Sequence, residues 1–115
     1  MADRRFVYMI KANKVKERYD GSLLVVRVNV LDARKLQAYA PLAAAVVEAY
    51  GGRYLARGGA HETTEGSNYA RNVIVCWPDM ATAHTAYPSP EYQKARDVLG
   101  DGAERLFVIV DGLPD

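Results

Sequence analysis

The chain has 115 residues, half of them hydrophobic and a quarter charged, a balance typical of one globular domain. Fifteen basic and 14 acidic side chains leave a formal net charge of +1, which favours neither nucleic acid nor an anionic membrane as a partner. The single cysteine cannot form an internal disulfide, and no apolar run approaches the roughly 20 residues of a membrane span. No secretory leader is recognisable, so we expect a cytoplasmic protein.

The first expected elements are a strand and a helix. Residues 23–30 alternate between an apolar face and a mixed face, as in a strand with one dry side. Asp32 stands at the N-cap position of a helix whose apolar residues recur at helical spacing up to residue 50, before the glycine pair at 51–52. Pro41 lies inside this helix and predicts either a kink or a later start.

The remaining segments complete a recognisable order of elements. In chain order, the pattern predicts a strand at 53–58, an irregular arm at 60–70, a strand at 72–77, short helices at 80–87 and 91–99, and a strand at 106–110. The order βαββαβ predicts an α+β, ferredoxin-like fold, a four-stranded antiparallel sheet with the helices on one face. Residues 23–115 would form this single domain. Residues 1–22 would be an N-terminal extension, either an extra strand or arm or a frayed terminus.

A sheet with helices on one face leaves its other face bare. Large exposed apolar surfaces are rare in monomers, so we expect two copies of the chain to pack together as a homodimer.

That bare face is also expected to carry polar side chains. If the apolar strand faces meet the helices, the opposite face presents Arg27, Asn29, Arg53, Arg57, Asn72 and Cys76, together with Leu55, Ile74, Phe107 and Ile109. Arginines in a partly dry cleft favour a carboxylate, enolate or phosphate. The predicted partner is therefore an anionic small molecule, bound by Arg27, Asn29, Arg53, Arg57 and Cys76. The alternative is that the arginines pair with carboxylates across the dimer and set its register.

Three residues are candidates for catalysis. His61, beside Glu62 at the edge of the expected cleft, could act as a general acid or base. Tyr87 and Tyr92 could donate to a developing oxyanion. The alternatives are a solvated loop histidine and two packing tyrosines. Histidine and cysteine spacings predict no metal site, and the glycine pairs lack dinucleotide or P-loop spacing, so no cofactor is expected.

Several segments together resemble a known family. They are GGRYLARGG at 51–59, Glu65-Gly66, RNVIVCWP at 71–78, SPEYQ at 89–93 and VDG at 110–112. In this order they are similar to domain-of-unknown-function family 1330, within the dimeric α/β-barrel superfamily. The resemblance implies that fold and a pocket of the superfamily's type, whose members include cofactor-free monooxygenases, polyketide cyclases and isomerases. Cys76 departs from the family pattern, which often has an acidic residue there.

The sequence therefore predicts a small homodimeric enzyme that binds a hydrophobic acidic or polyketide-like molecule. Its reaction would be cofactor-independent proton transfer, such as cyclisation or isomerisation. Arg57 and Arg27 would hold the anionic end, His61 would move the proton, and Tyr87 or Tyr92 would polarise a carbonyl. The alternatives are a non-catalytic small-molecule binder or accessory dimer, and a cofactor-free monooxygenase.

Overall fold

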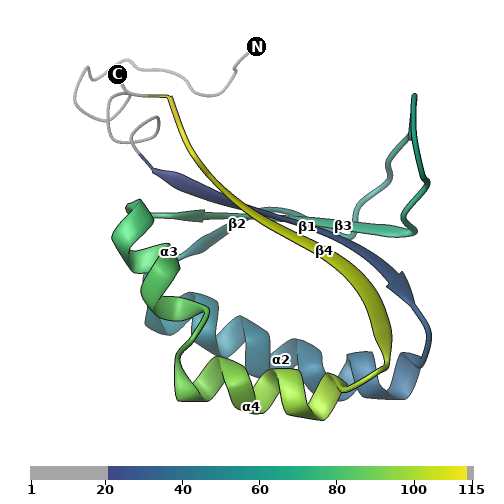
Figure 1. Cartoon of the computed structure of the whole chain (residues 1–115), viewed down its shortest axis with the longest axis horizontal. Helices are drawn as coiled ribbons and strands as arrows, with labels where there is room; N and C mark the ends of the chain where they lie inside the picture. The colour runs from purple at the N-terminus through teal and green to yellow at the C-terminus, as the bar shows by residue number, and fades with distance from the viewer. Residues whose placement is uncertain (1–20, 114–115) are drawn as a thin grey trace.

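The structure, a computed structural model, describes residues 21–113. In chain order its elements are β1 (Ser22–Val30), α2 (Ala33–Ala49), β2 (Arg53–Arg57), β3 (Arg71–Trp77), α3 (Met80–Ala86), α4 (Pro90–Leu99) and β4 (Ala103–Asp111). The strands form one antiparallel sheet in the order β2-β3-β1-β4. Figure 1 shows α2, α3 and α4 on the same side of this sheet. The predicted ferredoxin-like α+β fold is confirmed. Apart from its last two residues, the predicted N-terminal extension lies outside the described part of the chain.

Local capping explains where α2 begins and ends. The Asp32 carboxylate accepts hydrogen bonds from the backbone N–H groups of Arg34 (3.0 Å) and Lys35 (3.3 Å), which satisfies two donors that a helix start leaves free. Gly51, with φ of +75°, follows the end of the helix in a conformation that glycine adopts without strain. The helix runs through Pro41, so the alternative of a later start is wrong.

One end of the space between sheet and helices is tightly packed. Trp77 and Val75 of β3 form a buried cluster with Val46 and Val47 of α2 and with alanines of α3 and α4. A side-chain carbon placed on Gly52 would lie only 2.8 Å from the Trp77 ring. This end of the domain therefore has no space for an added methyl group.

Two strands differ from the predicted alternation. A bulge in β2 lies between Tyr54 and Ala56, so Arg57 pairs with Val73 and shares its helix-facing side. The prediction that Arg57 lies on the bare face is therefore wrong. In β4, Phe107 pairs with Val26, so the phase predicted for this strand is also wrong. The reason is that β4 has apolar residues on both faces, so its sequence does not indicate which face lies toward the helices.

The face of the sheet away from the helices is largely apolar at β4. Leu106, Val108 and Val110 are each about half exposed there, at 46 %, 46 % and 47 %, in place of the predicted Phe107 and Ile109. The segment between β2 and β3 projects from this side of the sheet (Figure 1). Within residues 21–113, no helix has the length and apolar character needed to cross a membrane.

Candidate functional site

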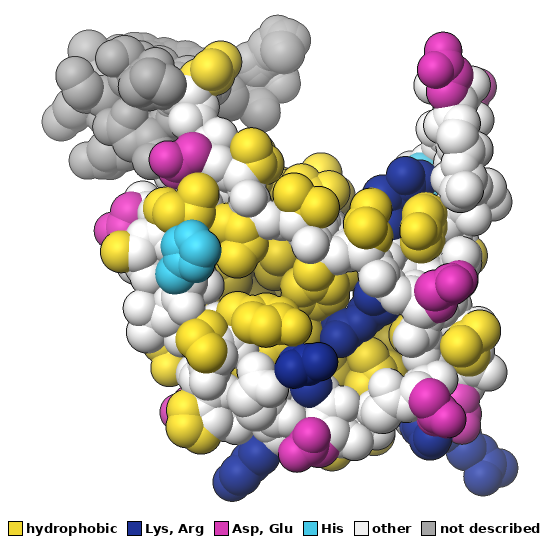
Figure 2. All heavy atoms as spheres, in the orientation of Figure 1, with side chains coloured by type: hydrophobic (Ala, Val, Ile, Leu, Met, Phe, Trp, Pro, Cys, Tyr) yellow, Lys and Arg dark blue, Asp and Glu magenta, His cyan; other side chains and the backbone are white. Residues whose placement is uncertain are grey.

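A cavity of about 230 Å³ lies between the sheet and the helices. Its walls are mostly apolar side chains, with Leu24, Val26 and Val28 of β1 along the floor and Leu36, Ala40 and Ala43 of α2 opposite. In Figure 2 it appears as a hollow with hydrophobic walls, and Lys or Arg side chains cross its mouth. The packed end around Trp77 closes one side. Such a cavity suits a small, mostly apolar molecule.

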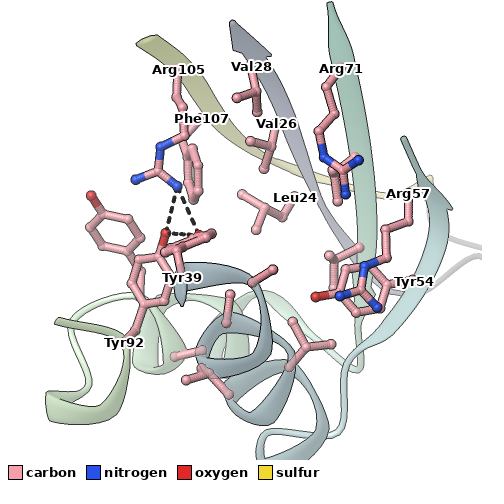
Figure 3. A pocket seen from close by; sticks show the side chains of 18 of the residues that line it. Leu24, Val26, Val28, Tyr39, Tyr54, Arg57, Arg71, Tyr92, Arg105 and Phe107 are labelled. Carbon is pink, nitrogen blue, oxygen red and sulfur yellow. Dashed lines mark hydrogen bonds between the residues drawn. The ribbon is translucent and has the colours of Figure 1, made fainter. Parts of the chain in front are cut away.

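Three arginines line the cavity, and the strand register explains how they meet. Val28 pairs with Arg71 on one neighbouring strand and with Arg105 on the other. The side chains of Arg71, Val28 and Arg105 therefore lie in one row on the helix-facing side of the sheet. The β2 bulge adds Arg57 in the adjacent row. Figure 3 shows all three guanidinium groups along the cavity. Three positive charges therefore gather around an apolar floor.

No acidic group balances these charges within the described residues. None of the cavity-lining residues is Asp, Glu or His. Within the described part of the chain, the ion pair found joins Lys35 and Asp101 at 2.6 Å, and neither residue lines the cavity. Partly buried cations without an anionic partner are costly in free energy, and a bound anion removes that cost.

Arg105 is held by two tyrosines from different helices. Its Nη1 donates hydrogen bonds to the hydroxyl oxygens of Tyr39 (2.9 Å) and Tyr92 (3.2 Å), and the two hydroxyls are 2.7 Å apart. Burial, followed by the neighbouring Tyr92 hydroxyl, raises the pKa of Tyr39 well above its ordinary value, and Arg105 offsets this only in part. Tyr39 thus keeps its hydroxyl proton at neutral pH, and either hydroxyl can be the donor in the hydrogen bond between Tyr39 and Tyr92.

Arg57 and Arg71 are positioned differently, with no hydrogen bond to a hydroxyl group found among the described residues. The Arg57 guanidinium lies over the Tyr54 ring, 4.3 Å from its centroid, and Figure 3 shows this stacking. The Arg71 guanidinium occupies the place of the missing side chain at Gly58, since a side-chain carbon there would collide with it. Stacking and close packing hold both planar groups at the cavity wall.

The structure brings three of the predicted site residues to the cavity: Arg57, Tyr87 and Tyr92. Tyr87 packs against Tyr92 with ring centroids 5.3 Å apart, and the residue is 37 % exposed. Tyr92 is buried, with its hydroxyl in the hydrogen-bonded group described above. Both tyrosines therefore have a packing contact and a position on the cavity wall.

Two of the remaining predicted residues hold the segment between β2 and β3. Arg27 donates a hydrogen bond to Asn72 Oδ1 (3.1 Å) and lies over the Tyr69 ring, 4.7 Å from its centroid. The side-chain oxygen of Asn29 accepts a hydrogen bond from the Ala70 backbone N–H (2.9 Å). On the face away from the helices, both side chains fasten the return of this segment to the sheet.

The other three predicted residues also lie outside the cavity. Arg53 and Cys76 pair with each other across β2 and β3, on the face away from the helices, and Cys76 is half-buried there. His61 is exposed in the segment between β2 and β3 and does not line the cavity. The part of the chain that the structure describes contains no cluster of three or more metal-ligating side chains.

Sequence reasoning missed three residues of the cavity: Tyr39, Arg71 and Arg105. Tyr39 is one of the residues that recur at helical spacing between Asp32 and residue 50, a pattern that by itself indicates packing rather than binding. The predicted strands begin at residues 72 and 106. Arg71 and Arg105 each lie one residue before these starts, and the structure includes both in their strands. Extending both strands toward their N-terminal ends would have placed each arginine in the alternation.

The sequence comparisons identify the family. The family model described as "Domain of unknown function (DUF1330)" matches residues 21–113. The chain belongs to this family. A comparison with curated proteins gave no match.

Solved structures share the fold of this DUF1330 protein at low sequence identity. A protein of unknown function from Rhodopseudomonas palustris is 15 % identical, with a TM-score of 0.69, over 94 % of this chain and 97 % of that one. A dimeric ferredoxin-like protein of unknown function from Thermobifida fusca is 12 % identical, with a TM-score of 0.55, over 79 % and 90 %. SnoaB, a cofactor-independent oxygenase from Streptomyces nogalater, is 13 % identical, with a TM-score of 0.57, over 84 % and 96 %. At these identities the likeness shows the fold alone.

Proposed function

We propose that the cavity binds a small organic acid with an apolar body and stabilises negative charge on one of its oxygens during cofactor-independent proton transfer. The observation that carries this proposal is the set of side chains on an otherwise apolar wall. Arg57, Arg71 and Arg105 are permanent donors, Tyr39 adds a hydroxyl, and no carboxylate or imidazole of residues 21–113 lines the cavity. Such a site attracts an oxyanion.

The reaction best supported is enolisation, the first step of an isomerisation or cyclisation. A proton leaves the carbon next to a carbonyl and passes to water. The electron pair of the broken C–H bond forms a C=C bond, and the π electron pair of the carbonyl moves onto its oxygen. Arg105 and its tyrosines stabilise that oxygen, and reprotonation at oxygen or at another carbon completes the step. Removing one such donor typically slows a reaction by about 100-fold or more.

Phenylpyruvate is a suitable probe because it combines an aromatic ring, a carboxylate and an enolisable carbonyl. We expect the protein to accelerate its keto–enol interconversion, followed by the ultraviolet absorbance of the enol, and Arg105→Gln to abolish the acceleration. His61→Ala is the discriminating control. An unchanged rate would remove the predicted role of His61, whereas loss of the acceleration would show that His61, and not water, accepts the proton. No acceleration by the native protein would contradict the proposed reaction.

A non-catalytic binder is the second candidate, because the described wall of the cavity holds hydrogen-bond donors but no Asp, Glu or His that could accept a proton as a general base. It predicts that phenylpyruvate binds, with affinity falling in steps as arginines are replaced, while the tautomer rate stays at the buffer value. The fold shared with SnoaB motivates one further measurement, oxygen consumption in the same mixture. Consumption coupled to loss of the enol would favour a cofactor-free monooxygenase.

We also propose that two copies pair through the sheet face away from the helices. Leu55, Leu106, Val108 and Val110 expose between 46 % and 54 % of their surface there, and the Thermobifida fusca protein of the same fold is dimeric. Val108→Glu should convert the dimer to a monomer in size-exclusion chromatography with light scattering. Val98→Glu, at an exposed position of α4, is the matched control and should leave the mass unchanged. A native monomer would contradict this pairing.

A further inference from the structure

The positive groups of the cavity form two separate clusters. Figure 3 shows Arg105 with Tyr39 and Tyr92 on one side, Arg57 and Arg71 on the other, and β1 side chains between them. Arg71 and Arg105 pair with the same residue of β1, Val28, from opposite sides. Their Cα atoms are therefore two interstrand spacings apart, about 10 Å. The floor between them is apolar.

The Arg105 cluster has donors left over after its internal hydrogen bonds are made. Two hydroxyl protons are present, and only one is needed for the hydrogen bond between Tyr39 and Tyr92. Nη1 of Arg105 donates to both hydroxyl oxygens, and no hydrogen bond from its Nε or Nη2 is found among the described residues. One hydroxyl proton and the outer guanidinium N–H groups can therefore converge on one ligand oxygen.

The second cluster suits a carboxylate instead. Arg57 and Arg71 are planar forks fixed by the Tyr54 ring and by the space at Gly58, and neither donates a hydrogen bond to another described residue. Guanidinium forks bind carboxylates through paired, parallel hydrogen bonds. Tyr54 contributes its ring to this cluster, and among the described residues no hydrogen bond joins its hydroxyl to either guanidinium, unlike the hydroxyls of Tyr39 and Tyr92 at Arg105.

We infer that the ligand has two different ends joined by an apolar body: a carboxylate bound by Arg57 and Arg71, and an enol or phenol oxygen bound by Arg105, Tyr39 and Tyr92. The substrate class is thus an aryl or enolisable acid whose reactive oxygen lies opposite its carboxylate. Phenylpyruvate, in which the carbonyl and the carboxylate are adjacent, tests enolisation and anion binding but not this orientation. This inference rests on the proposed function and adds the orientation of the ligand, which places the reacting oxygen at β4.

The probe (4-hydroxy-3-nitrophenyl)acetate tests this orientation, because its phenol titrates near neutral pH and its phenolate absorbs visible light. The groups facing the phenol would be Arg105 of β4, Tyr39 of α2, Tyr92 of α4 and Tyr87 beside α3. We expect the pKa of the bound phenol to fall by about one unit or more. Arg105→Gln should remove this fall while the probe still binds.

The double variant Arg57→Gln/Arg71→Gln should have the opposite pattern. We expect the affinity for the probe to weaken roughly tenfold or more, with the pKa of the bound phenol still lowered. 4-Methyl-2-nitrophenol, which lacks the carboxylate, should bind the native protein and this double variant equally. Arg34→Gln, an exposed position of α2 that does not line the cavity, controls for the loss of one charge.

Three results would overturn the inference, and they are distinguishable. If neither probe binds the native protein, the proposed function fails and the inference fails with it. If (4-hydroxy-3-nitrophenyl)acetate binds but the pKa of its phenol is unmoved, only the two-ended orientation is wrong. The same holds if Arg105→Gln and the double variant change the affinity and the phenol pKa in the same way. Circular dichroism of each variant establishes that it is folded.

Discussion

The two ends of the space between sheet and helices are built on opposite principles. At one end, Trp77 is 4 % exposed and packs among valines and alanines so closely that Gly52 has no room for a methyl group. At the other end, Arg57, Arg71 and Arg105 surround a cavity that residues 21–113 leave unfilled. The same sheet and helices form both ends, which differ in the side chains that they supply.

This contrast separates stability from binding. The packed end buries apolar area and fills volume, which are the main favourable contributions to folding. The arginine end leaves like charges near each other and a cavity open, both unfavourable for the isolated chain. Sites kept at a cost to stability are where function is expected. Substitutions at the two ends should therefore affect different measurements.

The largest effect is expected at the packed end. Trp77→Ala should lower the free energy of unfolding by about 3–5 kcal/mol, because it removes a large buried ring and leaves a cavity. Urea denaturation followed by circular dichroism measures this loss. A loss below about 1 kcal/mol would mean that the packed end contributes little to stability, contrary to the comparison.

The same substitution at two glycines compares the ends directly. Gly52→Ala should cost about 1–3 kcal/mol of stability by crowding the Trp77 ring, with binding of phenylpyruvate retained. Gly58→Ala should cost roughly 1–2 kcal/mol because φ is +70° there, and it should also weaken binding by displacing the Arg71 guanidinium. Calorimetry and urea denaturation give both quantities. Equal losses of affinity in the two variants would contradict the separation.

Arg71→Gln should reverse the pattern seen at Trp77. Removing one of several unpaired positive charges should change the free energy of unfolding by less than about 0.5 kcal/mol, or raise it, while the affinity for phenylpyruvate falls. Arg34→Gln, outside the cavity, should retain the native affinity. If Arg71→Gln unfolds the protein instead, the arginine end is part of the stabilising core.

The smallest effect is expected in the response to alkali. Because the pKa of Tyr39 is raised on folding, its contribution to stability is complete below the ordinary phenol pKa of about 10 and is lost as pH rises further. Tyr39→Phe cannot ionise, so the free energy of unfolding should fall less steeply above about pH 10 than in the native protein. An identical slope in both proteins would show that Tyr39 ionises freely in the fold.

The elements and their order could be predicted because their signals are local. Asp32, Asp79 and Ser89 cap the helices through bonds to backbone N–H groups two or three residues away. The strict alternation of β1 indicated its dry face. These features depend on neighbours in the chain, and the fold follows from their order.

The site could be predicted only in part, because it depends on register between strands. Tyr92 was singled out for a hydroxyl that the structure places against Arg105, but Arg105 itself was missed. Arg57 was assigned to the bare face because a bulge leaves no mark in a five-residue strand. Arg27 and Asn29, predicted to bind substrate, fasten a surface segment instead.

The sequence by itself thus determined the ferredoxin-like order of elements, the helix ends and the need for a second apolar contact beyond the helices. Only the tertiary structure decided which arginines face the cavity and which tyrosines join them. The physical reason is that capping and alternation act within a few residues. The convergence of Arg57, Arg71, Arg105 and Tyr39 requires the pairing of four strands and the placement of α2 over them.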